Sequence, residues 1–101
     1  MTPSRRVVNL LGGKTELVFS KPPLTHPDGT VCAGLCDPAN RKPIPRIRVD
    51  KTLEGVEMLE TLIHETLHRA GWHIDEDFVE KYSLGVAEML WNLGYRAPWD
   101  Q

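Results

Sequence analysis

The chain lacks the features that mark secreted, membrane-spanning or nucleic-acid-binding proteins. Its 101 residues include two cysteines, too few for a disulfide framework or a four-cysteine zinc site. No run approaches the ~20 apolar residues of a membrane span, and the apolar stretch that follows the first arginines is too short for a signal peptide. The net charge of -2 provides no basic field for nucleic acid. These absences predict a cytoplasmic protein with no membrane partner, and they argue against nucleic acid as a partner.

The composition that remains is that of an ordinary globular protein, with 41% hydrophobic and 26% charged residues. A chain of 101 residues predicts one domain, 1–101, with a core so modest that a bound metal ion would add useful stability. Cys32 and Cys36 are expected to be reduced, partly buried thiols.

The first half of the chain, residues 1–50, has the pattern of strands and loops. Glycines and prolines separate short runs of β-forming residues, which predict strands at 7–11, 15–20, 30–36 and 45–50. In the last of these runs Ile47 and Val49 alternate with arginines, which predicts one buried face and one exposed face.

The second half, residues 51–101, has the period of two helices and a docked tail. Apolar residues recur at helical spacing over 55–70, and Gly71 then provides a stop. Asp75 is placed to cap a second helix that ends before Gly94. The buried stripe expected for this second helix consists of Phe78, Val79, Tyr82, Val86, Met89, Leu90 and Leu93. The core and the docked tail are expected to hold the aromatic residues Trp72, Trp91, Tyr95 and Trp99. Together the two halves predict an α+β fold.

The segment IHETLH, residues 63–68, carries the chemistry of the chain. On a helix, His64 and His68 lie about 40° apart in rotation and about 6 Å apart along the axis, so both imidazoles can reach one metal ion. Zinc accepts two such nitrogen ligands. Glu65 projects about 100° away from His64, too far to be a comfortable ligand but close enough to reach a water on the metal. The motif therefore predicts two zinc ligands and a general base side by side.

A hydrolytic zinc site commonly has three protein ligands and one open position, so a third ligand must come from beyond the motif. On the second helix Glu76 lies at the edge of the apolar stripe, and this makes it the preferred candidate for facing the first helix. Glu80, farther round the same helix, and His73, in the turn between the helices, remain alternatives.

The segment TLIHETLHRAGW, with GLCDP, PRIRVD, DEDFVE and LWNLGYR, resembles the small zincin-like (HExxH) metallopeptidases of phages and prophages, which are related to SprT-like and gluzincin proteins. The resemblance implies a small antiparallel sheet packed on the motif helix and followed by a second, C-terminal helix, with PRIRVD as the strand that borders the substrate cleft. It also implies zinc as the cofactor, bound by His64 and His68, with Glu65 as the catalytic base. A glutamate of the next helix would complete the site, and Glu76 with Glu80 matches the gluzincin spacing of a ligand and a supporting carboxylate.

The sequence departs from the related metzincin pattern HExxHxxGxxH at one position. Gly71 is in register, but Ile74 stands where the third histidine belongs, and His73 is one place early. His73 therefore stays an alternative ligand.

The predicted function is that of a zinc-dependent metallopeptidase in which metal-activated water hydrolyses a peptide bond and Glu65 is the general base. Its partner would be a peptide or protein substrate, and its location the host cell cytoplasm if a phage encodes it. His26, His73 and Tyr82 are candidate donors to the reacting carbonyl, although Tyr82 is expected in the core and His26 in a loop. One alternative is a non-catalytic zinc-stabilised phage protein that binds a host or phage protein. Another is a DNA-associated module of the SprT-like kind. The oligomeric state and the cleavage preference do not follow from the sequence.

Overall fold

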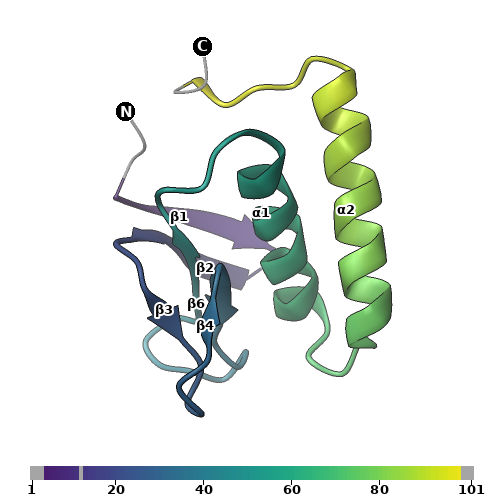
Figure 1. Ribbon diagram of the computed structural model, residues 1–101. Helices are drawn as coiled ribbons and strands as arrows, with labels where there is room; N and C mark the ends of the chain where they lie inside the picture. The colour runs from purple at the N-terminus through teal and green to yellow at the C-terminus, as the bar shows by residue number, and fades with distance from the viewer. Residues whose placement is uncertain (1–3, 12, 99–101) are drawn as a thin grey trace.

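The computed structural model describes residues 4–11 and 13–98 and has an α+β architecture, as predicted (Figure 1). Its main sheet has the strand order β1-β2-β6-β5 and is built from β1 (Arg5–Leu10), β2 (Gly13–Ser20), β5 (Gly34–Cys36) and β6 (Arg46–Asp50). The pairs β1–β2 and β5–β6 are antiparallel, whereas β2 and β6 run parallel. The sheet is therefore mixed and not purely antiparallel, because a long connection and not a hairpin leads from β2 to β6.

The segment 30–36, predicted as a single strand, contributes to two sheets. Its first part is β4 (Val31–Cys32), which pairs antiparallel with β3 (Leu24–Thr25) in a separate two-stranded sheet. Its second part is β5, which pairs with β6 of the main sheet. The prediction of one continuous strand was wrong because the chain changes partners at Ala33.

The edge strand of the sheet beside the cleft is β5 and not β6. The resemblance implied that PRIRVD would lie at the sheet edge, but β6 lies between β2 and β5. The predicted buried face of β6 is confirmed, since Ile47 and Val49 are 1% and 0% exposed. Both residues belong to a core with Phe19 and Met58.

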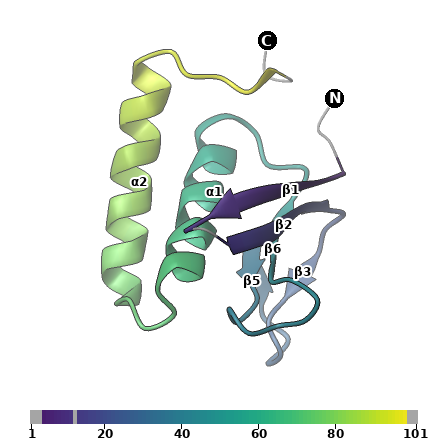
Figure 2. The same cartoon turned by 180° about the vertical axis from the view of Figure 1, so that it is seen from behind.

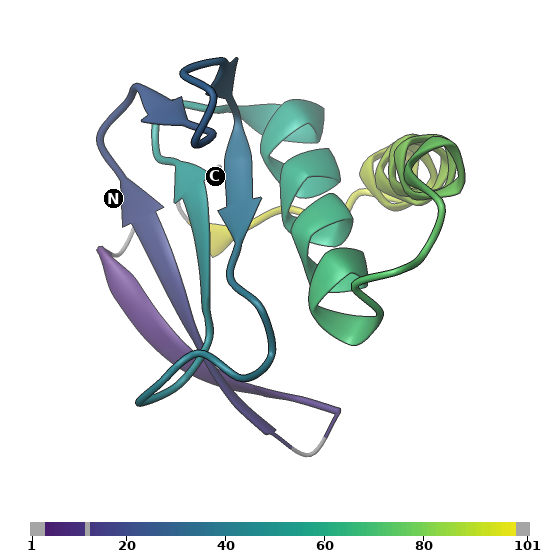
Figure 3. The same ribbon diagram turned by 90° about the horizontal axis from the view of Figure 1, so that it is seen from below.

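The two helices lie on one side of the sheet in successive layers (Figures 2 and 3). The first, α1 (Gly55–Ala70), packs against the sheet, and α2 (Glu76–Asn92) lies on the far side of α1. The predicted helix boundaries are confirmed: α1 ends before Gly71, and the Asp75 side chain accepts a hydrogen bond from the backbone N–H of Phe78 at 3.0 Å. No helix within the described residues is long and apolar enough to cross a membrane.

The buried face of α2 differs from the predicted stripe. Three residues spaced four apart, Val79, Ser83 and Ala87, are fully buried. The small size of Ser83 and Ala87 lets α2 approach α1 closely at this face. The prediction was wrong for the large residues that remain about half exposed or more, which are Phe78, Tyr82, Met89 and Leu93.

The chain after α2 leaves the end of this helix and runs across above the start of α1 (Figure 1). Arg96 stacks on the Trp91 ring at 3.3 Å from its centroid and donates a hydrogen bond to the Trp91 carbonyl at 2.9 Å. The prediction that aromatic residues dock the tail holds for Trp91. It fails for Trp72 and Tyr95, which are 59% and 63% exposed, and Trp99 lies outside the described residues.

Candidate metal centre

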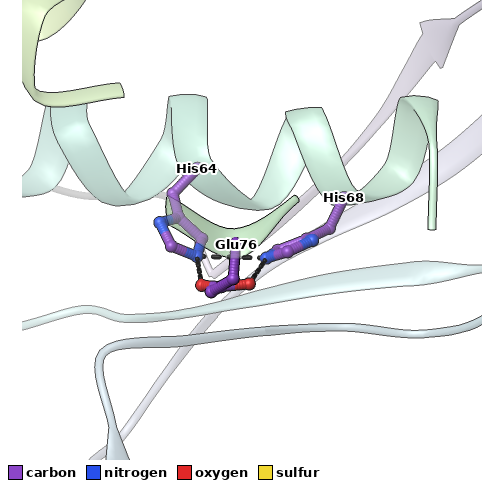
Figure 4. Close-up of side chains that lie close together, drawn as sticks. All are labelled: His64, His68 and Glu76. Carbon is purple, nitrogen blue, oxygen red and sulfur yellow. Dashed lines mark hydrogen bonds and ion pairs between the residues drawn. The ribbon is translucent and has the colours of Figure 1, made fainter. Parts of the chain in front are cut away.

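The third and fourth turns of α1 present the two histidines of IHETLH to a cleft. Because they are one helical turn apart, His64 and His68 project in the same direction, and their Nε2 atoms lie 3.1 Å apart (Figure 4). Their side chains are 21% and 19% exposed. Both histidines line this cleft and lie outside the buried core.

The first residue of α2 completes the cluster. The carboxylate of Glu76 reaches back across the turn between the helices, with one oxygen 3.0 Å from His64 Nε2 and the other 3.0 Å from His68 Nε2. Asp75, as the N-cap, fixes where α2 begins and hence where Glu76 points. Among the predicted third ligands, Glu76 is therefore the one that the structure brings to the histidines.

The other two candidates lie outside this cluster. Glu80 lines the same cleft one turn farther along α2, but it does not join the group formed by the two histidines and Glu76. His73 is exposed in the turn between the helices and does not line the cleft. The one-residue offset from the metzincin pattern thus leaves His73 away from the site.

The geometry of the cluster fits a metal ion. One ligand atom from each of His64, His68 and Glu76 lies within 4.8 Å of the others. Atoms that share a tetrahedral zinc ion at roughly 2.0 to 2.1 Å lie about 3.3 Å apart, close to the 3.0 and 3.1 Å observed. Two imidazoles and one carboxylate suit zinc better than calcium or magnesium, which prefer oxygen ligands. The three residues could therefore hold one metal ion.

Glu65 lies beside this cluster in a different environment. It is 6% exposed, and its side chain packs between α1 and the edge strand β5. Burial, together with a smaller effect of the negative charge of Glu76, raises the pKa of Glu65 to about 7. A carboxyl group with a pKa near neutrality can both accept and return a proton.

The edge strand β5 forms the opposite wall of the cleft. Ala33 and Asp37 use their peptide groups to pair with β6, through Asp50 N–H to Ala33 O at 2.8 Å and Asp37 N–H to Arg46 O at 2.9 Å. Peptide groups alternate in direction along a strand, so those of Gly34 and Cys36 point away from β6. No strand of the described chain covers this edge, so it can pair with an extended peptide.

Gly34 allows β5 to approach α1 closely. A Cβ atom placed there would lie 2.9 Å from Glu65 Cγ and 2.9 Å from Thr61 Cγ2. Gly34 was not among the residues predicted to shape the site, although an isolated glycine within a predicted strand is a known signal of close backbone approach.

A second residue missed at the sequence level is Arg48 of β6, which also lines the cleft. Its Nε atom is buried and has no hydrogen-bond partner among the described residues. The other arginines of this region are engaged, since Arg41 and Arg46 both pair with Asp37. No signal in the sequence separates Arg48 from these neighbours.

The remaining candidates differ in their distance from the cleft. His26 lines it, as do the free thiols of Cys32 and Cys36. Tyr82, predicted in the core, is 49% exposed and does not line the cleft. Of the three donors considered from the sequence, only His26 is therefore near the cluster.

Comparisons with protein-family models, with curated proteins and with solved structures found no match to this chain.

Proposed function

We propose that the chain is a zinc-dependent metallopeptidase that takes an extended peptide as its substrate. The observation that carries the proposal is the convergence of His64, His68 and Glu76 in a cleft that also holds the buried carboxyl of Glu65. A purely structural metal site has no need of that fourth group. A peptidase needs it, because a base must take the proton of the attacking water.

Each part of the cleft has a task in this reaction. The outward peptide groups of Gly34 and Cys36 bind the substrate backbone as an added strand, which gives affinity with little sequence preference. When zinc is bound, it polarises the substrate carbonyl and makes water a stronger nucleophile. Glu65 accepts the proton of that water and passes it to the leaving amine, and its pKa of about 7 suits both transfers.

The test compares Glu65→Gln with Glu57→Gln, a control on an exposed position of the same helix. Wild type is expected to bind one zinc ion per chain and to cleave unfolded protein or a peptide library. Glu65→Gln is expected to bind zinc equally but to cleave about 10² to 10⁴ times more slowly, whereas Glu57→Gln behaves as wild type. Cleavage by Glu65→Gln at the wild-type rate would refute the proposed mechanism.

A second candidate is a non-catalytic zinc protein that binds another protein. The observation in its favour is that the metal ligands come from both helices. Two of the fully buried residues of α2, Ser83 and Ala87, have small side chains and so bury little apolar surface. A metal ion would then fasten the helices together, and structural zinc contributes about 10 kcal/mol in small domains. A chain that binds zinc and gains stability, but cleaves no member of a broad peptide library, would favour this candidate.

The ligand set is tested separately from the activity. Glu76→Ala is expected to lose most of the zinc affinity, whereas Glu80→Ala is expected to keep it, because Glu80 lies outside the cluster. Equal zinc affinity of Glu76→Ala and wild type would show that this ligand assignment is wrong.

A further inference from the structure

Helix α2 carries a second apolar face that no part of the described chain covers. We call it the outer stripe: Phe78, Tyr82, Met89 and Leu93, which are 52%, 49%, 53% and 68% exposed. The rings of Phe78 and Tyr82 stack with centroids 5.5 Å apart. Single exposed apolar residues are common, but a contiguous patch on one face of a helix marks an interaction surface.

The outer stripe is separate from the face that packs on α1. At 100° per residue, its centre is about 110° away from the centre of the buried face at Val79, Ser83 and Ala87. Figure 3 shows α2 as the outermost layer of the described chain, with α1 between it and the sheet. The large apolar side chains of the outer stripe stay about half exposed or more among the described residues.

The spacing of the outer stripe is nearly symmetric about Gly85. Phe78 and Tyr82 precede this glycine by seven and three residues, and Met89 and Leu93 follow it by four and eight. A Cβ atom at Gly85 would meet nothing within 4 Å, so the middle of the stripe is open. A second α2, antiparallel and related by a two-fold axis that passes between Gly85 and Val86, would bring Phe78 onto the second copy's Leu93 and Tyr82 onto the second copy's Met89. A two-fold interface requires such a self-complementary patch.

The charges beside the stripe favour the same arrangement. Lys81 and Glu88 lie within about 20° of each other, on one flank of the outer stripe. In an antiparallel helix pair each flank meets the same flank of the other copy, so Lys81 would face the second copy's Glu88, and Glu88 its Lys81. In a parallel pair each flank would meet the opposite flank of the other copy, so Lys81 and Glu88 would not form these pairs.

We infer that the outer stripe is a homodimer interface, formed by antiparallel packing of α2 from two copies around Gly85. Four large side chains, each about half exposed, provide on the order of 400 Å² per copy. This is less than the roughly 800 Å² per partner of a standard interface. The dimer is accordingly weak, with a dissociation constant in the micromolar range, and it requires neither a metal ion nor a substrate.

The first test is sedimentation velocity on the full chain between about 1 and 500 µM. The average mass is expected to rise from 11.4 kDa towards twice that value, and Tyr82→Glu is expected to keep the chain monomeric at every concentration. Circular dichroism confirms that this variant is folded, and Glu57→Lys, on an exposed position of α1, serves as the control. Wild type that remains monomeric throughout overturns the inference and leaves the stripe to a different protein.

The second test exchanges the flanking charges and so distinguishes this arrangement from other dimers. Lys81→Glu and Glu88→Lys alone are each expected to weaken the dimer about five-fold to ten-fold, since each one breaks two exposed ion pairs across the interface. Lys81→Glu also breaks the Lys81–Asp77 pair within α2, but it does so equally in the monomer and the dimer. The double variant is expected to return to within about two-fold of wild type, because the pairs re-form with exchanged signs. A double variant that is as weak as the single variants, or weaker, overturns the antiparallel arrangement.

Discussion

Substitution of Gly34 by alanine tests whether β5 positions the general base. The added Cβ would lie 2.9 Å from both Glu65 Cγ and Thr61 Cγ2, whereas carbon atoms in contact are ordinarily about 3.5 to 4.0 Å apart. Because the two contacts come from successive turns of α1, a side-chain rotation of Glu65 relieves only one of them. Either α1 or the base must then move by roughly 0.6 to 1 Å.

This displacement has two measurable consequences. Overpacking of this kind costs about 1 to 3 kcal/mol of unfolding free energy, and each kcal/mol lowers the melting temperature of a domain of this size by about 4 to 8 °C. A catalytic group misplaced by about 1 Å can lower the rate on the order of 10²-fold. Zinc affinity should change little, because none of the three ligands is among the atoms nearest to that Cβ.

The assays are thermal unfolding by calorimetry, zinc titration and peptide cleavage, with Gly85→Ala as the matched control. Gly85 has open space around it and lies within a helix, so alanine there should raise the unfolding free energy by about 1 kcal/mol in dilute solution. If Gly34→Ala melts at the wild-type temperature and cleaves at the wild-type rate, β5 does not hold Glu65 in place and our account of the cleft is wrong.

Three further predictions follow from single residues. Ser83→Ala should raise the melting temperature by about 4 to 8 °C, because the fully buried hydroxyl has no hydrogen-bond partner within residues 4–11 and 13–98 and alanine removes roughly 1 kcal/mol of desolvation cost; a lower melting temperature would mean that the hydroxyl is satisfied. Burial alone would raise the pKa of Asp37, but hydrogen bonds and the charge of Arg46 outweigh it and leave the pKa below its usual value. Asp37→Asn should therefore be less stable than wild type by about 1 to 2 kcal/mol at pH 7 in urea titrations, and the difference should shrink below about pH 4 as the wild-type carboxylate becomes protonated; a difference that stays constant down to pH 2 would contradict this. Arg48 lies beside Leu35 on the face of the sheet opposite α1, so peptides that place an acidic residue next to Leu35 should be cleaved faster than the same peptides with the corresponding amide. Arg48→Gln should abolish that preference, and an unchanged preference would show that Arg48 does not take part in substrate recognition.

The parts of the fold that the sequence predicted correctly depend on local signals. The bounds of α1 follow from apolar periodicity and from Gly71, and the start of α2 follows from the side chain of Asp75. His64 and His68 converge because helical geometry alone determines the relation between residues four apart. These features need no knowledge of distant contacts.

The parts that were missed depend on pairings between distant segments. Strand β2 pairs in parallel with β6, and the chain changes its pairing partner at Ala33. The order of these segments along the chain does not predict which of them lie side by side in the sheet. The stripe of α2 was mistaken because this helix has two apolar faces, and periodicity cannot tell which one α1 covers. Residue size determines which face of α2 packs on α1, since Ser83 and Ala87 permit a closer approach than Tyr82 and Met89 do.

The attachment of α2 to α1 alone has a consequence for the dynamics of the protein. The outermost element is held from one side only, so it should be among the first to open in native-state hydrogen exchange. Each opening would carry Glu76 away from His64 and His68 and dismantle the cluster. Zinc affinity and the exchange protection of amides near Ala87 should therefore rise and fall together, although Ala87 lies three helical turns away from Glu76.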